Sequence, residues 1–454
     1  PGGSGVTFAN ATKNYTIWGI GKISGNTKLT KQGAGTATID TINDYTGVTS
    51  LNGGTLKVGT LTNGGIASSI GAADNSEANI TFNGGTLHYT GAATTIDRGF
   101  TTTGGNGGIL TDNDLTISGV AASTSAGNFT KSGAGNLKFT ADGVNIFGGG
   151  GAAGITVANG PLTFDGTGTS QINSVVNDIW VGTTASAGGS LLLENTTVSA
   201  STNGYLAIAR GSGTTGLTST CTLNNSTLTT GNLSLGYANG VGGYLATSVL
   251  TLNNSTYTMP GICRLAESGG ATGTVNLHGA SVMSSGETNI AQDSGSNGTL
   301  NINDTSVYTS NNRLQVGPAT GSAGNVVISG SGSMIVNAYV SVGYNGGGSM
   351  TVKDNATLSN NDDFSVNENG AAPATVTLQD NGSISAAGVV FVGRGAGRVG
   401  TLTQTGGTFT GSGNEFQIGK FGQGTWLQSG GVTNAGGWVS IGRETSGTGV
   451  LTVS

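Results

Sequence analysis

The chain has 454 residues, of which 86 are glycine and only 8% are charged, and its formal net charge is −6. Ordinary domains contain about 7% glycine and about 25% charged residues, so this composition disfavours most intracellular enzyme classes. The 16 basic residues are scattered singly, whereas a nucleic-acid-binding protein needs a basic patch to displace counterions. No apolar run reaches the roughly 18 residues of a membrane span.

A long repeat occupies the N-terminal part of the chain, at positions 1–165. One copy covers residues 25–58 and contains the segments LTKQGAGT, NDYTG and NGGTLKV. A second copy covers residues 128–164, and a partial copy covers residues 83–89. Short runs that alternate apolar with polar residues, separated by glycine, are typical of β-strands joined by corners.

A shorter repeat follows from about residue 175. Each copy begins with an apolar residue, any residue, Val, Ile or Leu, and then a small residue. The eleven small closing residues recur at nearly even spacing, at positions 182, 209, 236, 266, 291, 317, 343, 367, 393, 419 and 442. Two further alternating segments follow in each copy, such as residues 299–302 and 306–308, with a polar corner between them.

Three short strands in each copy of this repeat leave no room for two-residue hairpins or helical crossovers. We therefore predict an all-β fold, a single-stranded parallel β-helix (β-solenoid), in which each strand pairs with its copy one coil along, about 4.8 Å away. Ile302 and Leu378 are predicted to point inward, and Asn301 and Thr377 outward. Residues 1–165 form the part with the long repeat and residues 166–454 the regular part of about eleven coils, in one continuous solenoid.

The first copy of the long repeat resembles the autotransporter-associated β-strand repeat. That family reads L-x-K-x-G-x-G-T-L-x-L, then N-x-Y-x-G, then G-G-x-L-x-V. Residues 30–58 match nearly throughout, with Ala37 where the family has Leu, whereas the second copy has residues 146–148 in place of Tyr-Thr-Gly. Later coils, such as residues 438–453, resemble the repeat shared by type-V-secreted and PEP-CTERM-sorted proteins. The resemblance implies a large, exported, surface-associated protein of Gram-negative-type bacteria, of which this chain is a segment.

The histidines and cysteines do not suggest a reactive centre. His88 and His278 lie between inward apolar positions, so both should face solvent, and no partner is apparent for either. Cys221 and Cys263 occupy inward positions about two coils apart, beyond the reach of roughly 7 Å between Cα atoms that a disulfide allows. We expect two free, buried thiols.

Lysines and glycines of the long repeat are also expected to be structural. Lys28, Lys31 and Lys131 belong to the repeat pattern and should lie at edges or corners, where lysine keeps strands soluble. The run Gly148–Gly151 lacks the Lys-Ser/Thr and the helix that follow a phosphate-binding loop, so a bulge or long loop is predicted there.

The acidic residues are densest at Asp362, Asp363 and Glu368. Asp363 and Glu415 occupy equivalent outward positions two coils apart, about 10 Å, which exceeds the roughly 6.5–9.5 Å of an inverting glycosidase pair. A solvated acidic face is therefore expected. Four outward aromatic residues could stack on sugars, but they are not on adjacent coils and are expected to be scattered: Tyr205, Tyr339, Phe391 and Trp438.

A polar corner follows each second strand. It holds Asn, Asp or Gly in successive coils, at positions 195, 225, 254, 279, 304, 330, 354 and 380. These residues tolerate left-handed geometry, which explains them as turn residues. Asp354 and Asp380 fall in adjacent coils and should stack about 5 Å apart, so a calcium ion held by this pair is the alternative. No other cofactor or metal is predicted.

The sequence thus favours a structural role without enzymatic activity, as a rigid extracellular fibre, stalk or coat. The partners would be neighbouring repeats or further copies of the protein, and the edge of residues 449–454 should be covered by more chain or by another subunit. The first alternative is an adhesin that binds glycans, such as a surface polysaccharide, on a lateral face. The second is a polysaccharide-degrading enzyme.

Overall fold

The chain is an all-β, parallel β-solenoid of about 17 turns with roughly 25 residues per coil, which confirms the predicted fold class. The computed structural model describes residues 5–124, 127–148, 153–183, 187–211, 216, 218–237 and 245–454. Most of the predicted Gly148–Gly151 loop lies outside these residues. In the described part of the chain, no helix is long and apolar enough to cross a membrane, and the one helix is the short η1 (Glu77–Asn79).

The chain divides into two compact units. Unit 1 contains residues 1–206 and 223–229, and unit 2 contains residues 207–222 and 230–454. The predicted change of repeat at residue 165 falls inside unit 1. Two strands, β23 (Tyr205–Ile208) and β24 (Thr218–Asn224), contain residues of both units.

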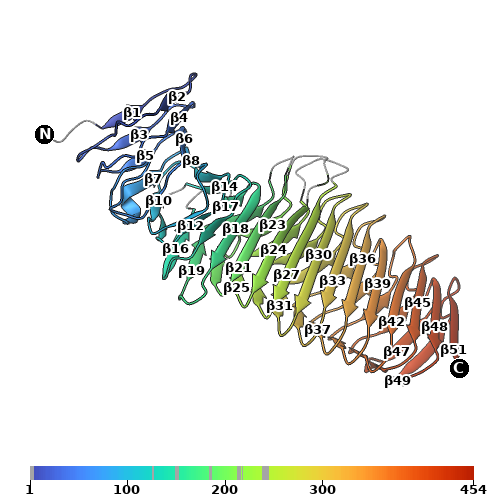
Figure 1. The fold of residues 1–454 in the computed structure, drawn as a ribbon. Coiled ribbons are helices and arrows are strands. Elements are labelled where there is room, and N and C mark those ends of the chain that lie inside the picture. Colours follow the sequence, from blue (N-terminus) through green and yellow to red (C-terminus); the bar gives the residue numbers. More distant parts are fainter. Residues whose placement is uncertain are drawn as a thin grey trace. The chain divides into compact units, whose positions relative to one another are not determined.

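The described strands of unit 1 form four parallel rows, coloured blue to green in Figure 1. The first row is β1 (Val6–Phe8), β3 (Leu29–Lys31), β5 (Thr49–Leu51), β7 (Ile80–Phe82), β10 (Phe100–Thr102) and β13 (Ala121–Ser123). The second is β2 (Tyr15–Ile17), β4 (Thr36–Ile39), β6 (Gly54–Val58), β8 (Gly85–Tyr89), β11 (Gly107–Thr111), β14 (Phe129–Ser132), β17 (Ala153–Val157) and β20 (Asp178–Val181). The third is β9 (Thr94–Ile96), β12 (Leu115–Ile117), β15 (Leu137–Phe139), β18 (Gly160–Asp165) and β21 (Gly189–Glu194). The fourth is β16 (Val144–Phe147), β19 (Ile172–Val175), β22 (Thr197–Ala200) and β25 (Thr227–Thr229).

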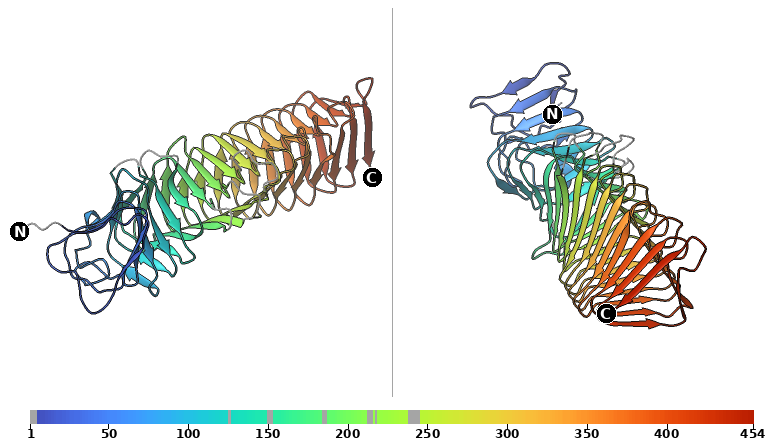
Figure 2. Two further views of the ribbon diagram at one scale, coloured as in Figure 1. Left: turned by 90° about the horizontal axis from the view of Figure 1, so that it is seen from above. Right: turned by 90° about the vertical axis from the view of Figure 1, so that its right-hand side faces the viewer.

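Unit 2 has three parallel sheets among its described residues, and Figure 2 shows their strands stacked as successive rungs. The β26–β50 sheet contains β26 (Asn232–Leu235), β29 (Ile262–Leu265), β32 (Glu287–Ile290), β35 (Leu314–Val316), β38 (Val340–Val342), β41 (Phe364–Val366), β44 (Val390–Val392), β47 (Glu415–Ile418) and β50 (Trp438–Ile441). The β27–β51 sheet contains β27 (Thr247–Asn253), β30 (Thr272–His278), β33 (Asn297–Ile302), β36 (Ala323–Ile328), β39 (Gly347–Val352), β42 (Ala374–Leu378), β45 (Val399–Gln404), β48 (Gln423–Gln428) and β51 (Thr448–Val453). The β28–β49 sheet contains β28 (Thr256–Thr258), β31 (Val282–Ser285), β34 (Val307–Ser310), β37 (Ser333–Val336), β40 (Thr357–Asn360), β43 (Ser383–Ala386), β46 (Thr408–Gly411) and β49 (Val432–Ala435).

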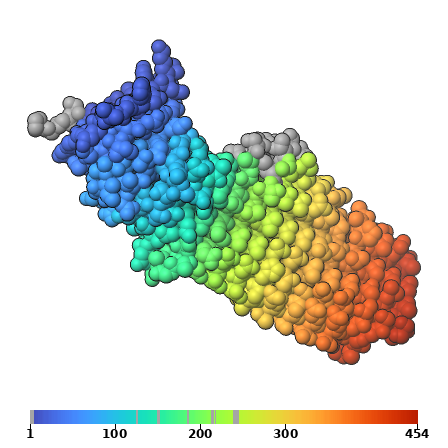
Figure 3. Space-filling view, in the orientation of Figure 1, coloured from blue at the N-terminus to red at the C-terminus, as the bar shows by residue number. Residues whose placement is uncertain are grey.

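The two units differ in the regularity of their coils. In unit 2, Thr247 stands opposite Thr272, and Thr272 opposite Asn297, so these two coils have the same length. In unit 1, Leu29 stands opposite Thr49, and Thr49 opposite Ile80, so the second coil is much longer than the first. The space-filling view shows the coils of unit 2 as close-packed successive bands (Figure 3).

Left-handed residues end the first strand of each predicted coil. All eleven predicted closing residues have positive φ, from 53° at Ala266 to 79° at Gly343. Glycine adopts this geometry without steric cost, and alanine does so only at a cost of about 1–2 kcal/mol. The small residue of the sequence motif is thus the point at which the chain turns out of one sheet toward the next.

The core is made of the inward residues of each strand. Ile302 and Leu378 are fully buried, and their neighbours Asn301 and Thr377 are half-buried, as the alternation predicts. In unit 1 the core also contains stacked phenylalanines, for example Phe100 and Phe129, whose ring centroids are 5.3 Å apart. Such aromatic pairs add about 0.5–1.5 kcal/mol beyond the area they bury.

Candidate functional site

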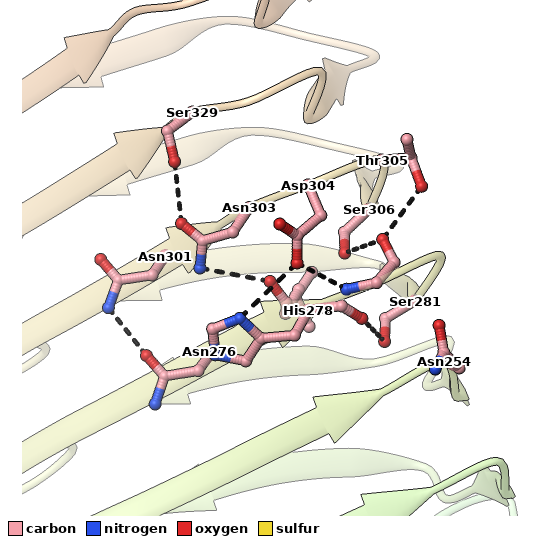
Figure 4. A network of polar contacts seen from close by, with 12 residues as sticks. Asn254, Asn276, His278, Ser281, Asn301, Asn303, Asp304, Thr305, Ser306 and Ser329 are labelled. Atoms are coloured by element: carbon pink, nitrogen blue, oxygen red, sulfur yellow. Dashed lines mark hydrogen bonds and ion pairs between the residues drawn. The ribbon is translucent and has the colours of Figure 1, made fainter.

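Unit 2 has a polar ladder at the corner that follows the β27–β51 sheet, shown in Figure 4. Asp304 Oδ2 accepts a hydrogen bond from the Gly279 backbone N–H at 2.8 Å. The side chains of the flanking strands continue the ladder, because Asn301 Nδ2 donates to Asn276 Oδ1 at 2.8 Å. The residue at the corner has positive φ in each of these coils, for example 59° at Asp304, so the turn interpretation of this position is correct.

The predicted calcium pair lies on the same ladder. Asp354 Oδ2 accepts from the Gly330 backbone N–H at 2.9 Å, and Asp380 Oδ2 accepts from the Asp354 backbone N–H at 3.2 Å. Each carboxylate therefore completes the hydrogen bonding of the preceding corner. Over the described residues, no group of three or more His, Cys, Asp or Glu side chains could hold a metal ion. Calcium binding by Asp354 and Asp380 stays a prediction. One oxygen of each carboxylate already accepts a backbone hydrogen bond, and calcium would compete with that bond.

Both histidines have an acidic partner one coil along, contrary to the expectation that neither has one. His88 Nε2 lies 3.0 Å from Asp112 Oδ1, and His278 Nδ1 lies 3.8 Å from Asp304 Oδ2. Both side chains retain solvent exposure, as predicted. Each partner is about one coil away in the sequence, so a search at the coil period, rather than among chain neighbours, would have found them.

The lysines of the long repeat do not lie where the sequence suggested. Lys28 is exposed, but Lys31 and Lys131 are fully buried. Lys131 stands in register with Ile109 and Val157, so it occupies an inward position. The prediction of edge or corner lysines was wrong for these two, because their long apolar stems fill core space while the ammonium reaches the backbone of the corner directly after its own strand.

Backbone carbonyls hold these two buried ammonium groups. Lys31 Nζ donates to the carbonyl oxygens of Gln32 and Gly33 at 3.0 and 2.8 Å. Lys131 Nζ donates to those of Ser132 and Gly133 at 2.9 and 2.7 Å. Burial lowers the pKa of both lysines, that of Lys131 to about 8. Their role is to complete the hydrogen bonding of the corner, which a solubilising lysine would not do.

The cysteines are free and buried, as predicted. Burial raises the pKa of each thiol to about 12. A thiolate is the reactive form of cysteine, so both side chains act as small core residues.

A surface hollow of about 240 Å³ lies on the outer face of the β26–β50 sheet. Six residues line it: Tyr339, Tyr344, Asp362, Asp363, Glu368 and Arg394. Four of the six were singled out from the sequence as acidic or aromatic surface residues, namely Tyr339, Asp362, Asp363 and Glu368. The sequence reasoning missed Tyr344 and Arg394, although both stand one residue after a closing glycine.

The solenoid brings these residues together in two walls. Tyr339 and Asp363 directly precede β38 and β41, and these strands pair with Val340 opposite Phe364. The other wall is a column at the ends of three successive strands, each residue two positions beyond its strand: Tyr344 after β38, Glu368 after β41 and Arg394 after β44. Arg394 Nη1 donates to Glu368 Oε1 at 3.1 Å, which joins two coils of this wall.

Ser341 and Ser365 stand opposite each other on β38 and β41, and neither is among the residues that line the hollow. The alternation of the strands turns them to the outer face, because Val340 and Val342 on either side of Ser341 belong to the core. Ser341 is fully buried and Ser365 is 1% exposed, and neither hydroxyl has a hydrogen-bond partner among the described residues. Glu368 Oε2 is likewise buried and without a partner in the described part of the chain.

Asp363 and Glu415, the carboxylates compared with a glycosidase pair, take part in separate hydrogen bonds. Asp363 Oδ1 accepts from the Val389 backbone N–H at 2.9 Å. Glu415 is bonded to Arg443 and accepts from Gln417 Nε2 and Ser440 Oγ. Burial raises the pKa of Glu415, but these hydrogen bonds outweigh it and leave the pKa lowered. Both carboxylates thus hold neighbouring coils together.

The predicted outward aromatic residues have different surroundings. Trp438 is 81% exposed, whereas Phe391 is buried although it points outward. The Arg394 guanidinium lies 4.4 Å from the centroid of the Phe391 ring, and the Lys420 ammonium lies 5.2 Å from it. Cations stack favourably on aromatic faces, so the Phe391 ring is occupied by these two cations and does not offer a free face.

Comparison with known proteins gives one informative match. No family model matches the sequence, and no solved structure matches it. The Adhesin BmaC autotransporter of Brucella suis biovar 1 (strain 1330) is 32% identical over 241 residues, which are 51% of this chain and 7% of that protein. The chain therefore spans a small part of this relative. The match and the β-solenoid together fit an autotransporter-associated repeat protein.

Proposed function

We propose that this chain is a repeat segment of a secreted, surface-associated, adhesin-like protein of Gram-negative-type bacteria and has no catalytic activity. The supporting observation is the 32% identity, over half of the chain, to a protein named an adhesin autotransporter. The relative's name applies to a whole protein of which the match covers 7%. The adhesive role of this segment is therefore part of the proposal.

The physical properties of the solenoid support a mechanical contribution as a stalk or fibre. Parallel pairing places backbone hydrogen bonds between successive coils, so stretching along the coil stack acts on many bonds at once. Outward ladders of Asn, Ser and Thr, such as Asn276 with Asn301, avoid the repulsion that stacked charges would create. The two carboxylates most like a hydrolase pair, Asp363 and Glu415, are used in bonds between coils.

Surface labelling and adherence assays test the proposal. Antibodies raised against this chain should label intact cells of the source bacterium, and deletion of the segment should reduce adherence to host or abiotic surfaces severalfold. A control deletion of the same length elsewhere in the gene product should leave labelling by these antibodies intact. Labelling that requires permeabilised cells would contradict the surface location, and unchanged adherence would contradict the adhesive role.

Self-association or pairing with neighbouring repeats is a second part of the proposal. The final strand β51 has exposed apolar residues, with Val450 48% and Val453 69% exposed. Exposed strand edges pair readily with further strands. We expect the isolated chain to associate in sedimentation experiments, and Val453→Lys to reduce this association. A monomer at all concentrations and salt levels would overturn this part.

A further inference from the structure

We propose that the hollow on the β26–β50 sheet of unit 2 binds a neutral saccharide. The inference rests on the proposed adhesin-like function for its biological meaning, and it names the site and the class of ligand. The residues that carry it are the two tyrosines, the three carboxylates and the arginine that line the hollow.

The first argument is the mixture of donors and acceptors around the hollow. Arg394 donates to Glu368 through Nη1, and its side chain is 34% exposed. Asp363 uses Oδ1 for the Val389 backbone N–H, and Glu368 Oε2 has no partner among the described residues. A sugar hydroxyl donates one hydrogen bond and accepts others, so a wall that offers both kinds of group matches a row of hydroxyls.

The second argument is the pair of buried serine hydroxyls. Ser341 and Ser365 do not line the hollow, but they lie on the strands β38 and β41 that position its walls. Neither has a hydrogen-bond partner within the described ranges. An unpaired buried polar group costs about 1–3 kcal/mol, and native structures retain few of them. These two hydroxyls and Glu368 Oε2 are shielded from solvent, so a ligand in the hollow gains their hydrogen bonds only when the side chains that cover them move.

The third argument is the pair of tyrosines. Tyr339 and Tyr344 come from the same coil, one from each wall, and both are half-buried. Gln315 Nε2 donates to the Tyr339 hydroxyl at 2.8 Å, which fixes this ring. Burial raises the pKa of Tyr339 against the opposing effect of Arg313. Aromatic rings with a fixed position offer an apolar face to the C–H side of a sugar ring without a large loss of conformational entropy.

Charge and size narrow the ligand class. Three carboxylates against one guanidinium repel an acidic sugar, because like charges close together are unfavourable. The net negative charge of the lining also attracts cations, so a lysine-rich peptide is the competing ligand class in the test. A hollow of about 240 Å³ lies below the roughly 300–1,000 Å³ of drug-sized ligand pockets, so it suits one sugar unit of a longer chain.

The test is binding of defined sugars to the purified chain in its full length. Neutral probes are the methyl glycosides of glucose, galactose and mannose and N-acetylglucosamine; charged probes are glucuronic acid, N-acetylneuraminic acid and a lysine-rich peptide. Saturation-transfer NMR and titration calorimetry should detect at least one neutral probe with millimolar affinity. Tyr344→Ala and Arg394→Gln should each weaken it at least tenfold.

Matched variants separate this site from general surface effects. Trp438→Ala removes an exposed aromatic of the same sheet and should leave affinity within twofold. Tyr339→Phe keeps the ring but removes the hydroxyl that accepts from Gln315, so it should weaken binding, by less than Tyr344→Ala does. If Arg394→Gln fails to fold, Asp362→Asn, at an exposed position, replaces it and should weaken binding at least threefold.

Three results would overturn the proposal: no binding of any neutral probe, binding of only the charged probes, or binding unaffected by Tyr344→Ala. Because this experiment is performed in solution, its failure leaves the labelling and adherence tests of the adhesin-like function untouched. Conversely, a chain that binds sugar but is not displayed on cells would contradict only the proposed function.

Discussion

The two units differ in how the backbone groups at the corners between strands are accommodated. In unit 2, coils of nearly equal length, such as those from Thr247 to Thr272 and from Ala323 to Gly347, place a left-handed residue at the same point of each turn. In unit 1, a short coil is followed by a much longer one, and buried cations donate to the corner carbonyls. All three buried cations among the described residues belong to unit 1: Lys31, Arg98 and Lys131.

This difference shows what regular spacing provides. When successive coils have nearly the same length, each backbone N–H finds the carbonyl one coil along, and the described core of unit 2 contains no buried cation. When the length changes, carbonyls are left over, and a group with several donors can satisfy them together. Arg98 does this for Ile66 and Gly71, with bonds of 3.3 and 2.9 Å.

The largest expected effect comes from a charge placed inside a regular coil. Ile302→Asp should destabilise unit 2 by about 4 kcal/mol or more, because a buried charge without a partner costs several kcal/mol. The neighbouring Asn301→Ala should change stability by less than about 1 kcal/mol. Urea unfolding followed by circular dichroism measures both. Similar shifts for the two variants would mean that the assigned inward and outward faces are wrong.

A smaller effect is expected at the left-handed closing positions. Gly317→Ala should cost about 2–3 kcal/mol, because its φ is 68° and an added Cβ would lie 2.3 Å from the Gly347 carbonyl oxygen. Position 291 in the preceding coil already holds alanine at φ 65°, so Ala291→Gly should be close to neutral. Thermal melting of the two variants provides the comparison. Equal melting temperatures for the two variants would show that the close approach of a Cβ to Gly347 does not lower stability.

A pH effect should be specific to unit 1. The folded pKa of Lys131 is lowered to about 8 from 10.5, so between these values the unfolded chain binds a proton that the folded chain has lost. Stability should therefore rise with pH, by about 1.5 kcal/mol between pH 8 and 9.5. Lys131→Met should flatten this part of the profile, measured as urea midpoints at each pH. A Lys131→Met profile parallel to that of the unaltered chain would contradict the lowered pKa.

The smallest effect is expected from calcium at the corner ladder of unit 2. Because Asp354 and Asp380 each accept a backbone N–H, we expect millimolar calcium or a chelator to move the melting temperature by less than about 1 °C. Asp380→Asn serves as the control, since it keeps a side-chain oxygen and loses the charge. A clear calcium-dependent rise that this variant abolishes would instead establish the calcium pair predicted from the sequence.

Sequence alone determined three features of this protein: the length of the repeating coil, the inward and outward faces of its strands, and the left-handed positions at its corners. These features are local: alternation places Ile302 inward and Asn301 outward, and left-handed geometry requires glycine or another small or Asx residue at the eleven closing positions. The same local rules placed Cys221 and Cys263 in the core as free thiols.

Only the tertiary structure decided which residues meet between coils. The partner of His88 is Asp112, the ammonium of Lys131 reaches the carbonyls of its own corner from an inward position, and Tyr344 joins Arg394 in one wall. Such contacts depend on register across coils of unequal length and on where long side chains end. A pattern of strands fixes the direction of a side chain at its Cβ, whereas the position of its polar end is set by the packing around it.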